Sequence, residues 1–200
     1  MKKPNYLLQD ELPSNSWLTK DTNKEIIRCV SKKIADPENL SNEEEMTVKR
    51  LIDFVVASQD ENFNFEGKED YLRPAVGLAG CQIGKNLDIF YVRFNLKEGK
   101  IEEYAMINST IISSSTRITC LQEGEGCLSV DKDKSGIVPR SWKIVVEGYD
   151  WITKKYIQLT LRDYRSIVFQ HEMDHNNGKL YYDKISKSDP EYTEEDWVIL

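Results

Sequence analysis

The order of its elements predicts an α+β fold for this chain, with antiparallel β-sheets packed around one central helix and further helices near the N-terminus. Segments in which apolar residues recur at helical spacing come first in the chain. Paired strand-like segments joined by short turns follow, and one more helical segment comes after them. Strands grouped in this way favour an α+β domain, because a parallel βαβ array would alternate strands with helices.

The length and composition are typical of one globular domain. Of the 200 residues, 40% are hydrophobic and 30% charged, and we expect one domain over 1–200 with an N-terminal extension at 1–20 and a C-terminal tail at 187–200. The net charge of −7 argues against broad, sequence-independent binding to nucleic acid, and we expect no direct readout of nucleic acid. We see no apolar run that could span a membrane and no signal peptide, so we expect a cytoplasmic protein without a membrane partner.

Two helices are predicted before the first strand. Thr22-Asn23-Lys24-Glu25 has the pattern of a capping box, and apolar residues continue at helical spacing to Ile34, before Asp36-Pro37 ends the helix. Ser41-Asn42-Glu43-Glu44 is a second capping box, and we expect its helix to reach about Ser58. Both helices therefore precede the strands.

Strand patterns fill the middle of the chain. After a polar loop at 59–73, residues 87–95 and 101–107 predict two strands joined by a turn at 97–100. A third strand is predicted at about 110–119.

A second hairpin and the last helix follow. Residues 142–149 and 155–161 predict the hairpin, and a helix is expected to start near Asp163. Asn177-Gly178 provides the signal that ends this helix. Residues 180–182 predict a short strand, and the acidic tail after it is expected to be loose.

Both histidines of the chain lie in one short stretch, Gln170-His171-Glu172-Met173-Asp174-His175. A helix places His171 and His175 on the same face, where two imidazoles can bind one metal ion. Glu172 lies beside the first of them, in the place of the general base in H-E-x-x-H sites. A buried histidine is more often a core residue, but the coincidence of both histidines in this pattern favours a metal site.

A catalytic site of this kind needs a third metal ligand. The short segment after His175 offers none in a familiar relation, which weakens the alternative of a zinc endopeptidase. Cys127 lies upstream in Glu125-Gly126-Cys127-Leu128-Ser129, where Gly126 allows close approach of the backbone. A Cys/His/His set leaves a fourth position open for water. The other cysteines, expected to be buried thiols, are Cys29, Cys81 and Cys120.

Three segments together resemble peptide deformylases, namely Val76-Gly77-Leu78-Ala79-Gly80-Cys81-Gln82, Glu125-Gly126-Cys127-Leu128-Ser129 and Gln170-His171-Glu172-Met173-Asp174-His175. Their order and spacing match as well, over roughly residues 40–185. The family usually has Gly at Ala75, Ala at Gly80 and Leu at Asn176, so this chain departs at three positions. The long loop before the first segment is similar to the longer class of Gram-positive bacteria and mycoplasmas.

The resemblance implies a metal-dependent hydrolase that removes the N-formyl group from the formyl-methionine of newly made polypeptides and releases formate. The implied metal ligands are Cys127, His171 and His175. The implied native ion is Fe²⁺, and Zn²⁺, Ni²⁺ or Co²⁺ can occupy such sites. Glu172 would take the proton from the attacking water, while the Gln82 side chain and the Leu128 backbone N–H would stabilise the oxyanion.

Further roles are implied for residues around these ligands. The implied substrate contacts are Val76, Gly77, Gly126, Tyr164, Ile167 and Val168. The first three would bind the extended peptide and the last three would line the pocket for the methionine side chain, although ordinary core packing explains their helical spacing equally well. Glu125 and Arg140 would form a structural ion pair.

The implied partners are N-formylmethionyl nascent peptides, and contact with the ribosome near the exit tunnel stays open. A third hypothesis is a non-catalytic protein of deformylase type that binds metal or formylated peptide. The presence of Glu172, Gln82 and Cys127 argues against it.

Overall fold

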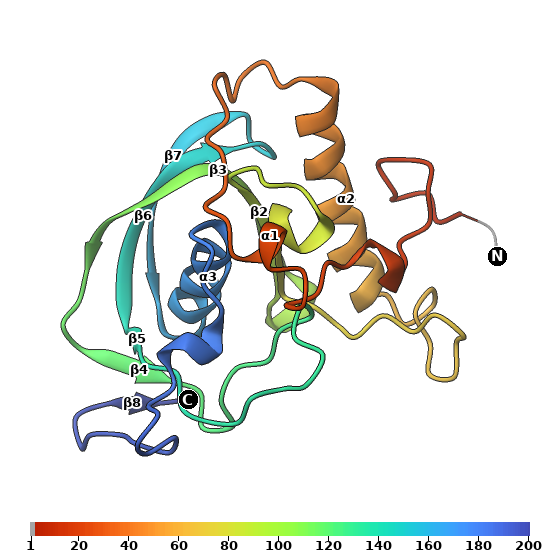
Figure 1. The fold of residues 1–200 in the computed structure, drawn as a ribbon. Coiled ribbons are helices and arrows are strands. Elements are labelled where there is room, and N and C mark those ends of the chain that lie inside the picture. Colours follow the sequence, from red (N-terminus) through yellow and green to blue (C-terminus); the bar gives the residue numbers. More distant parts are fainter. Residues whose placement is uncertain (1–2) are drawn as a thin grey trace.

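The computed structural model describes residues 3–200 and has the predicted α+β fold (Figure 1). Within these residues, a five-stranded antiparallel sheet has the order β1-β2-β3-β6-β7, and a three-stranded sheet has the order β5-β4-β8. The strands are β1 (Gly77–Ala79), β2 (Ile89–Asn95), β3 (Ile101–Ser114), β4 (Ile118–Cys120), β5 (Arg140–Ser141), β6 (Lys143–Asp150), β7 (Lys155–Arg162) and β8 (Val198–Ile199). The α-helices are α1 (Lys24–Ile27), α2 (Asn42–Gln59) and α3 (Asp163–Asn176).

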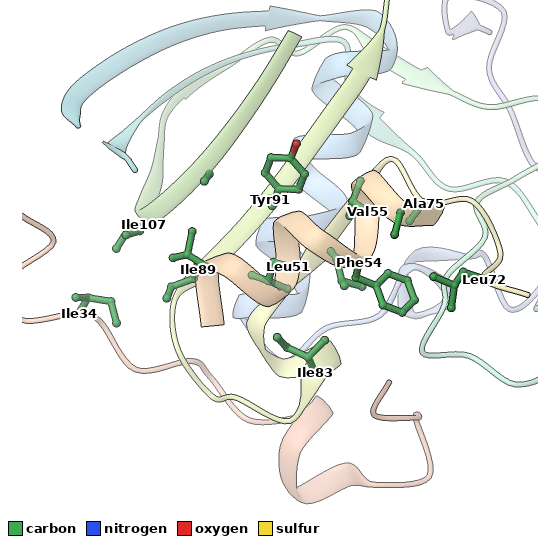
Figure 2. Packing of buried hydrophobic residues seen from close by; sticks show 14 of the residues in the cluster. Ile34, Leu51, Phe54, Val55, Leu72, Ala75, Ile83, Ile89, Tyr91 and Ile107 are labelled. Atoms are coloured by element: carbon green, nitrogen blue, oxygen red, sulfur yellow. The ribbon is translucent and has the colours of Figure 1, made fainter. Parts of the chain in front are cut away.

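Strand β2 separates the core into two parts. Successive side chains of a strand point to opposite faces, so Ile89 and Tyr91 pack with α2, whereas Phe90 and Val92 pack with α3. Figure 2 shows the α2 side of this arrangement, with the labelled residues Ile34, Leu51, Phe54, Val55, Leu72, Ala75, Ile83, Ile89, Tyr91 and Ile107. Because both faces of β2 are covered, the strand gives α3 a rigid support.

The second predicted helix is confirmed, together with its cap. The Ser41 hydroxyl accepts the backbone N–H of Glu44, and the Glu44 carboxylate accepts the N–H of Ser41 at 2.7 Å. Such a capping box satisfies two backbone donors that the helix itself leaves free. The helix α2 extends to Gln59, one residue beyond the predicted end.

The first predicted helix is wrong in its length. Helix α1 ends at Ile27 instead of continuing to Ile34, and the residue before it, Asn23, makes no side-chain capping bond. The backbone after α1 bonds to distant segments, as when the N–H of Ser31 donates to the carbonyl of Asn176 at 2.8 Å. Tertiary hydrogen bonds therefore override the helical spacing of apolar residues here.

The strands predicted at 101–107 and about 110–119 are mostly one long strand, β3. Two register shifts against β6 interrupt β3 after Ile107 and after Ile111, and Asn108 has a positive φ of 55°. Bulges of this kind break the alternation of side chains, which explains why the sequence indicated two strands. The predicted hairpin at 142–149 and 155–161 is confirmed as β6 and β7.

The C-terminal end differs from prediction in two places. Tyr181–Lys184 forms a 3₁₀ helix where a strand was predicted at 180–182. The tail predicted to be loose carries β8, which pairs in parallel with β4 through Val198 and Thr119. The N–H of Leu200 also donates to the carbonyl of Cys120 at 2.9 Å. The two paired strands, β4 and β8, are far apart in the sequence, so the acidic composition of the tail did not indicate that they pair.

The cysteines of the described chain are all free thiols, as expected. Cys81, Cys120 and Cys127 are buried, but Cys29 is exposed, so the prediction of burial is wrong for Cys29. No helix in residues 3–200 is long and apolar enough to cross a membrane.

Candidate metal centre and its cleft

Helix α3 carries both histidines and is fixed to the small sheet by Gln170. The Gln170 side chain accepts the N–H of Ser141 at 3.1 Å and donates to the carbonyl of the same residue at 2.9 Å. The helix ends as predicted, with Gly178 at a positive φ of 67°. This anchoring fixes the rotation of α3, so His171 and His175 face the interior with their ring centroids 5.0 Å apart.

Cys127, His171 and His175 come together as a possible ligand set. Each contributes one ligand atom, and these atoms all lie within 4.8 Å of one another. The Cys127 Sγ atom is 3.3 Å from Nε2 of His175, and Sγ also accepts the N–H of Ser129 at 3.4 Å. A sulfur and two imidazoles at this spacing fit a divalent transition-metal ion.

Buried charges behind His171 orient its ring. Nδ1 of His171 lies 2.8 Å from Glu125 Oε2, which leaves Nε2 of the ring free for a metal ion. Arg140 donates to both carboxylate oxygens of Glu125, at 2.8 and 2.9 Å, and also pairs with Asp174. Although burial opposes its ionisation, hydrogen bonds from Arg140 and His171 lower the pKa of Glu125 to about 2.

The electrostatics of His171 also fit a bound cation. Burial disfavours the charged imidazole, yet bonding to Cys127 and Glu125 raises the pKa of His171 well above its usual value. The site thus attracts positive charge between these two groups, and a divalent ion at the ligand set would supply it. His175 differs, because burial lowers its pKa well below the usual value and favours the neutral form that binds metal.

Glu172 is buried beside the ligand set. The residue is only 4% exposed, and its Oε2 atom has no hydrogen-bond partner among the described residues. Burial raises the pKa of Glu172 to about 7. A Cβ atom at Gly77 would lie 2.5 Å from Glu172 Oε1, so only glycine lets β1 approach this carboxylate.

A cleft of about 220 Å³ opens onto this centre. Twelve of the site residues predicted from the sequence line it, namely Val76, Gly77, Gln82, Glu125, Gly126, Cys127, Leu128, Tyr164, Ile167, Val168, His171 and Glu172. His175 and Arg140 do not line the cleft and lie behind it as the partners of Cys127 and Glu125. Ile167 and Val168 are buried, whereas Tyr164 is 42% exposed.

Gln82 is held in one orientation by the backbone. Its Oε1 atom accepts the N–H of Ala79 at 2.8 Å, which directs Nε2 toward Cys127 Sγ at 3.5 Å. An amide donor is therefore preset beside the ligand set. Leu128 lines the same cleft, and its carbonyl oxygen accepts a hydrogen bond from Lys20 Nζ at 2.8 Å.

Sequence reasoning missed two residues of this region. Asp174 lies within the histidine stretch, but its bond to Arg140 joins α3 to β5, which no local pattern reveals. Arg73 lines the cleft and pairs with Asp133, 60 residues away in the chain. Its place directly before the glycine-bearing segment of β1 was the available signal.

Known proteins similar to this chain are peptide deformylases, in agreement with the resemblance noted in the sequence. The profile of the family described as Polypeptide deformylase matches residues 17–191. The peptide deformylase of Malacoplasma penetrans (strain HF-2) is 36% identical over 187 residues, covering 92% of this chain and 95% of the relative. Peptide deformylase 2 of Bacillus cereus is 42% identical over 166 residues, covering 82% of this chain and 86% of the relative. The predicted similarity to enzymes of Gram-positive bacteria and mycoplasmas is confirmed.

Solved structures share the fold. A probable peptide deformylase from Synechococcus phage S-SSM7 has a TM-score of 0.66 at 24% identity, and the match covers 84% of this chain and 97% of that one. The Met-Ala-Ser-bound class I type b peptide deformylase from Acinetobacter baumannii has a TM-score of 0.65 at 21% identity, with 84% and 96% covered. At these identities the likeness concerns the fold.

Proposed function

The chain belongs to the peptide deformylase family and removes the N-formyl group from nascent peptides, and we propose that Fe²⁺ bound by Cys127, His171 and His175 serves this hydrolysis. The observation that carries the proposed hydrolytic mechanism, whichever ion is bound, is the position of Glu172. Its unpartnered carboxylate lies in the same cleft as Cys127 and His171. The family match does not support the zinc endopeptidase or the non-catalytic protein considered from the sequence.

The roles of the side chains follow from their positions. When bound, a divalent ion supplies a Lewis acid and lowers the pKa of water. Glu172 takes the proton from the attacking water and transfers it to the amine nitrogen that leaves. Gln82 Nε2 and the backbone N–H of Leu128 stabilise the oxyanion that develops at the formyl oxygen. Neutral His175 and the Glu125-bound His171 keep their positions during these steps.

The rest of the cleft binds the substrate. The peptide backbone lies against Val76, Gly77 and Gly126, and the methionine side chain packs with Tyr164, Ile167 and Val168. Ile167 and Val168 are buried and apolar, which suits a methionine side chain. Formylated chains emerge from ribosomes, so we place the enzyme in the cytoplasm, near the exit tunnel.

The identity of the ion is tested by its sensitivity to air. Fe²⁺ beside the Cys127 sulfur is open to oxidation, so we expect anaerobically purified protein to hold about one Fe²⁺ per chain and to lose activity in air. Protein loaded with Ni²⁺ should keep its activity under the same exposure. The measurement is formate release from formyl-Met-Ala against time, and equal air stability of both forms would contradict the assignment of Fe²⁺.

Gln82→Glu tests the proposed oxyanion donor. The new side chain keeps an oxygen that can accept the N–H of Ala79, but it lacks the amide donor. We expect kcat to fall by about 10²–10³ or more, since loss of one such donor costs that much and the added charge opposes the oxyanion. Steady-state kinetics on formyl-Met-Ala measure the effect, with metal content as the control. A kcat equal to that of the wild type would remove Gln82 from the mechanism.

A further inference from the structure

Arg73 reaches across the mouth of the cleft from one wall to the other. One wall of the cleft is formed by residues 73–77, and Arg73 belongs to this wall, shortly before β1. The opposite wall is formed by residues 125–128, and the Arg73 Nη1 atom pairs with Asp133 Oδ2, which follows this wall in the chain, at 3.2 Å. Its Nη2 atom lies so close to Gly126 that any Cβ atom there would overlap with it. The guanidinium therefore lies against Gly126, which the proposed function assigns to binding of the substrate backbone.

Arg73 also sets the charge of this part of the cleft. Among the described lining residues, the acidic groups are Glu125 and Glu172, and Glu125 is already paired with Arg140. Arginine is always protonated in proteins, so Arg73 is a permanent cation at the cleft mouth. In a chain of net charge −7, this cation creates a local preference for a negative group.

The present partner of Arg73 is easy to replace. The Arg73 and Asp133 side chains are 53% and 54% exposed, and the two Nη1–oxygen distances are 3.2 and 3.4 Å. Ion pairs as exposed as this one contribute little to stability, because water and salt screen them. A carboxylate on a bound peptide can therefore take the place of Asp133 at little cost.

The path of the substrate leads to this residue. Strand β1 is an edge strand of the larger sheet, bonded to β2 on one side, and its other side faces the cleft. With the formyl group beside Glu172, an extended peptide can follow the strand edge from Gly77 toward Arg73. About four residues of such a peptide span roughly 13 Å, since a strand advances about 3.3 Å per residue. Residues that follow the methionine then lie beneath Arg73.

We propose that Arg73 is a specificity-determining residue that favours formylated peptides with an acidic side chain within the three residues after methionine. The substrate carboxylate exchanges with Asp133 as the partner of the guanidinium, and a basic side chain at the same place is disfavoured. This proposal rests on the proposed function, because it assumes the orientation of the peptide in the deformylase cleft.

The test compares formyl-Met-Ala-Glu-amide with formyl-Met-Ala-Lys-amide, which differ only in the charge of one side chain. We expect wild-type protein at low salt to give a kcat/KM ratio of about two- to fivefold in favour of the glutamate peptide, the effect of one exposed ion pair. The ratio should fall to about one in Arg73→Gln and rise in Asp133→Asn. Lys132→Gln is the matched control, because it removes one positive charge from an exposed neighbour of Asp133, and its ratio should equal that of the wild type.

A wild-type ratio near one, or an unchanged ratio in Arg73→Gln, would overturn the proposal. Calorimetric titration with the products Met-Ala-Glu-amide and Met-Ala-Lys-amide gives the same comparison from dissociation constants, without turnover. Loss of formate release with a preserved charge preference in binding would count against the proposed catalytic roles alone. Equal binding of both products in all variants would count against Arg73.

Discussion

Glu172→Gln should lower kcat on formyl-Met-Ala by about 10²–10⁴-fold, the usual contribution of a positioned general base. The substitution keeps the shape of the side chain, so the close contact with Gly77 is retained, but an amide cannot take a proton from water. Stability should not fall, because Glu172 Oε2 is buried without a partner and a neutral group there is less costly. Loss of activity in a protein that is at least as stable is thus the expected result.

Three measurements separate this effect from a structural one. Metal content should equal that of the wild type, since Glu172 is not among the three ligand residues. The thermal midpoint should be equal or higher, and KM should change little compared with kcat. Wild-type kcat in the variant would remove the proton-transfer role of Glu172, and a parallel loss of metal would mean that the variant does not test it.

Cys127→Ala should abolish metal binding and reduce formate release by on the order of 10³ or more, because hydrolysis near neutral pH depends on the bound ion. Cys127 is the sulfur ligand of the set and lies 3.3 Å from His175 Nε2. Without it the ion keeps two imidazoles and loses its negatively charged ligand. Metal analysis after dialysis against a weak chelator, together with kinetics, measures both effects.

Cys120→Ala is the matched control for this prediction. Cys120 is equally buried, but it belongs to β4 and is not among the ligand residues. The control should keep the full metal content and the full kcat, with at most a small loss of stability from the cavity. If both variants kept the metal, the ligand set would be wrong.

The elements that a local pattern determines were predicted well from the sequence. The capping box at Ser41 and the spacing of His171 and His175 depend on helix geometry over a few residues, and the structure has both. The alternation that predicted β6 and β7 is equally local. Cys127 was proposed as the third ligand from its place beside Gly126 and the lack of a familiar ligand after His175, and the family resemblance then supported it.

Long-range contacts account for the predictions that were wrong. Helix α1 stops early because its continuation bonds to Asn176, and the C-terminal tail is ordered because β8 pairs with Thr119. The partly buried bond between Arg140 and Asp174 joins β5 and α3 through residues that are 34 positions apart in the chain. Such partners are set by the packing of the whole fold, so no single stretch of sequence reveals them.

Two departures from the family pattern have local explanations. Gly80 stands where the family usually has alanine, and a Cβ atom there would lie 2.9 Å from the carbonyl oxygens of Lys85 and Leu87. Asn176 stands where leucine is usual, and its buried amide donates to Asp88 at 2.8 Å. The backbone turn after β1 and the end of α3 are therefore matched to these residues, and the ligand set is unaffected.

The most direct test of the account is product analysis with formyl-Met-Ala-Ser and anaerobically purified, iron-loaded protein. The account predicts equal amounts of formate and of Met-Ala-Ser with a free amino group, with no cleavage of the Met–Ala bond. Mass spectrometry and a formate assay measure both products in one reaction. Cleavage of the Met–Ala bond, or no formate from protein that holds about one metal ion per chain, would contradict the account.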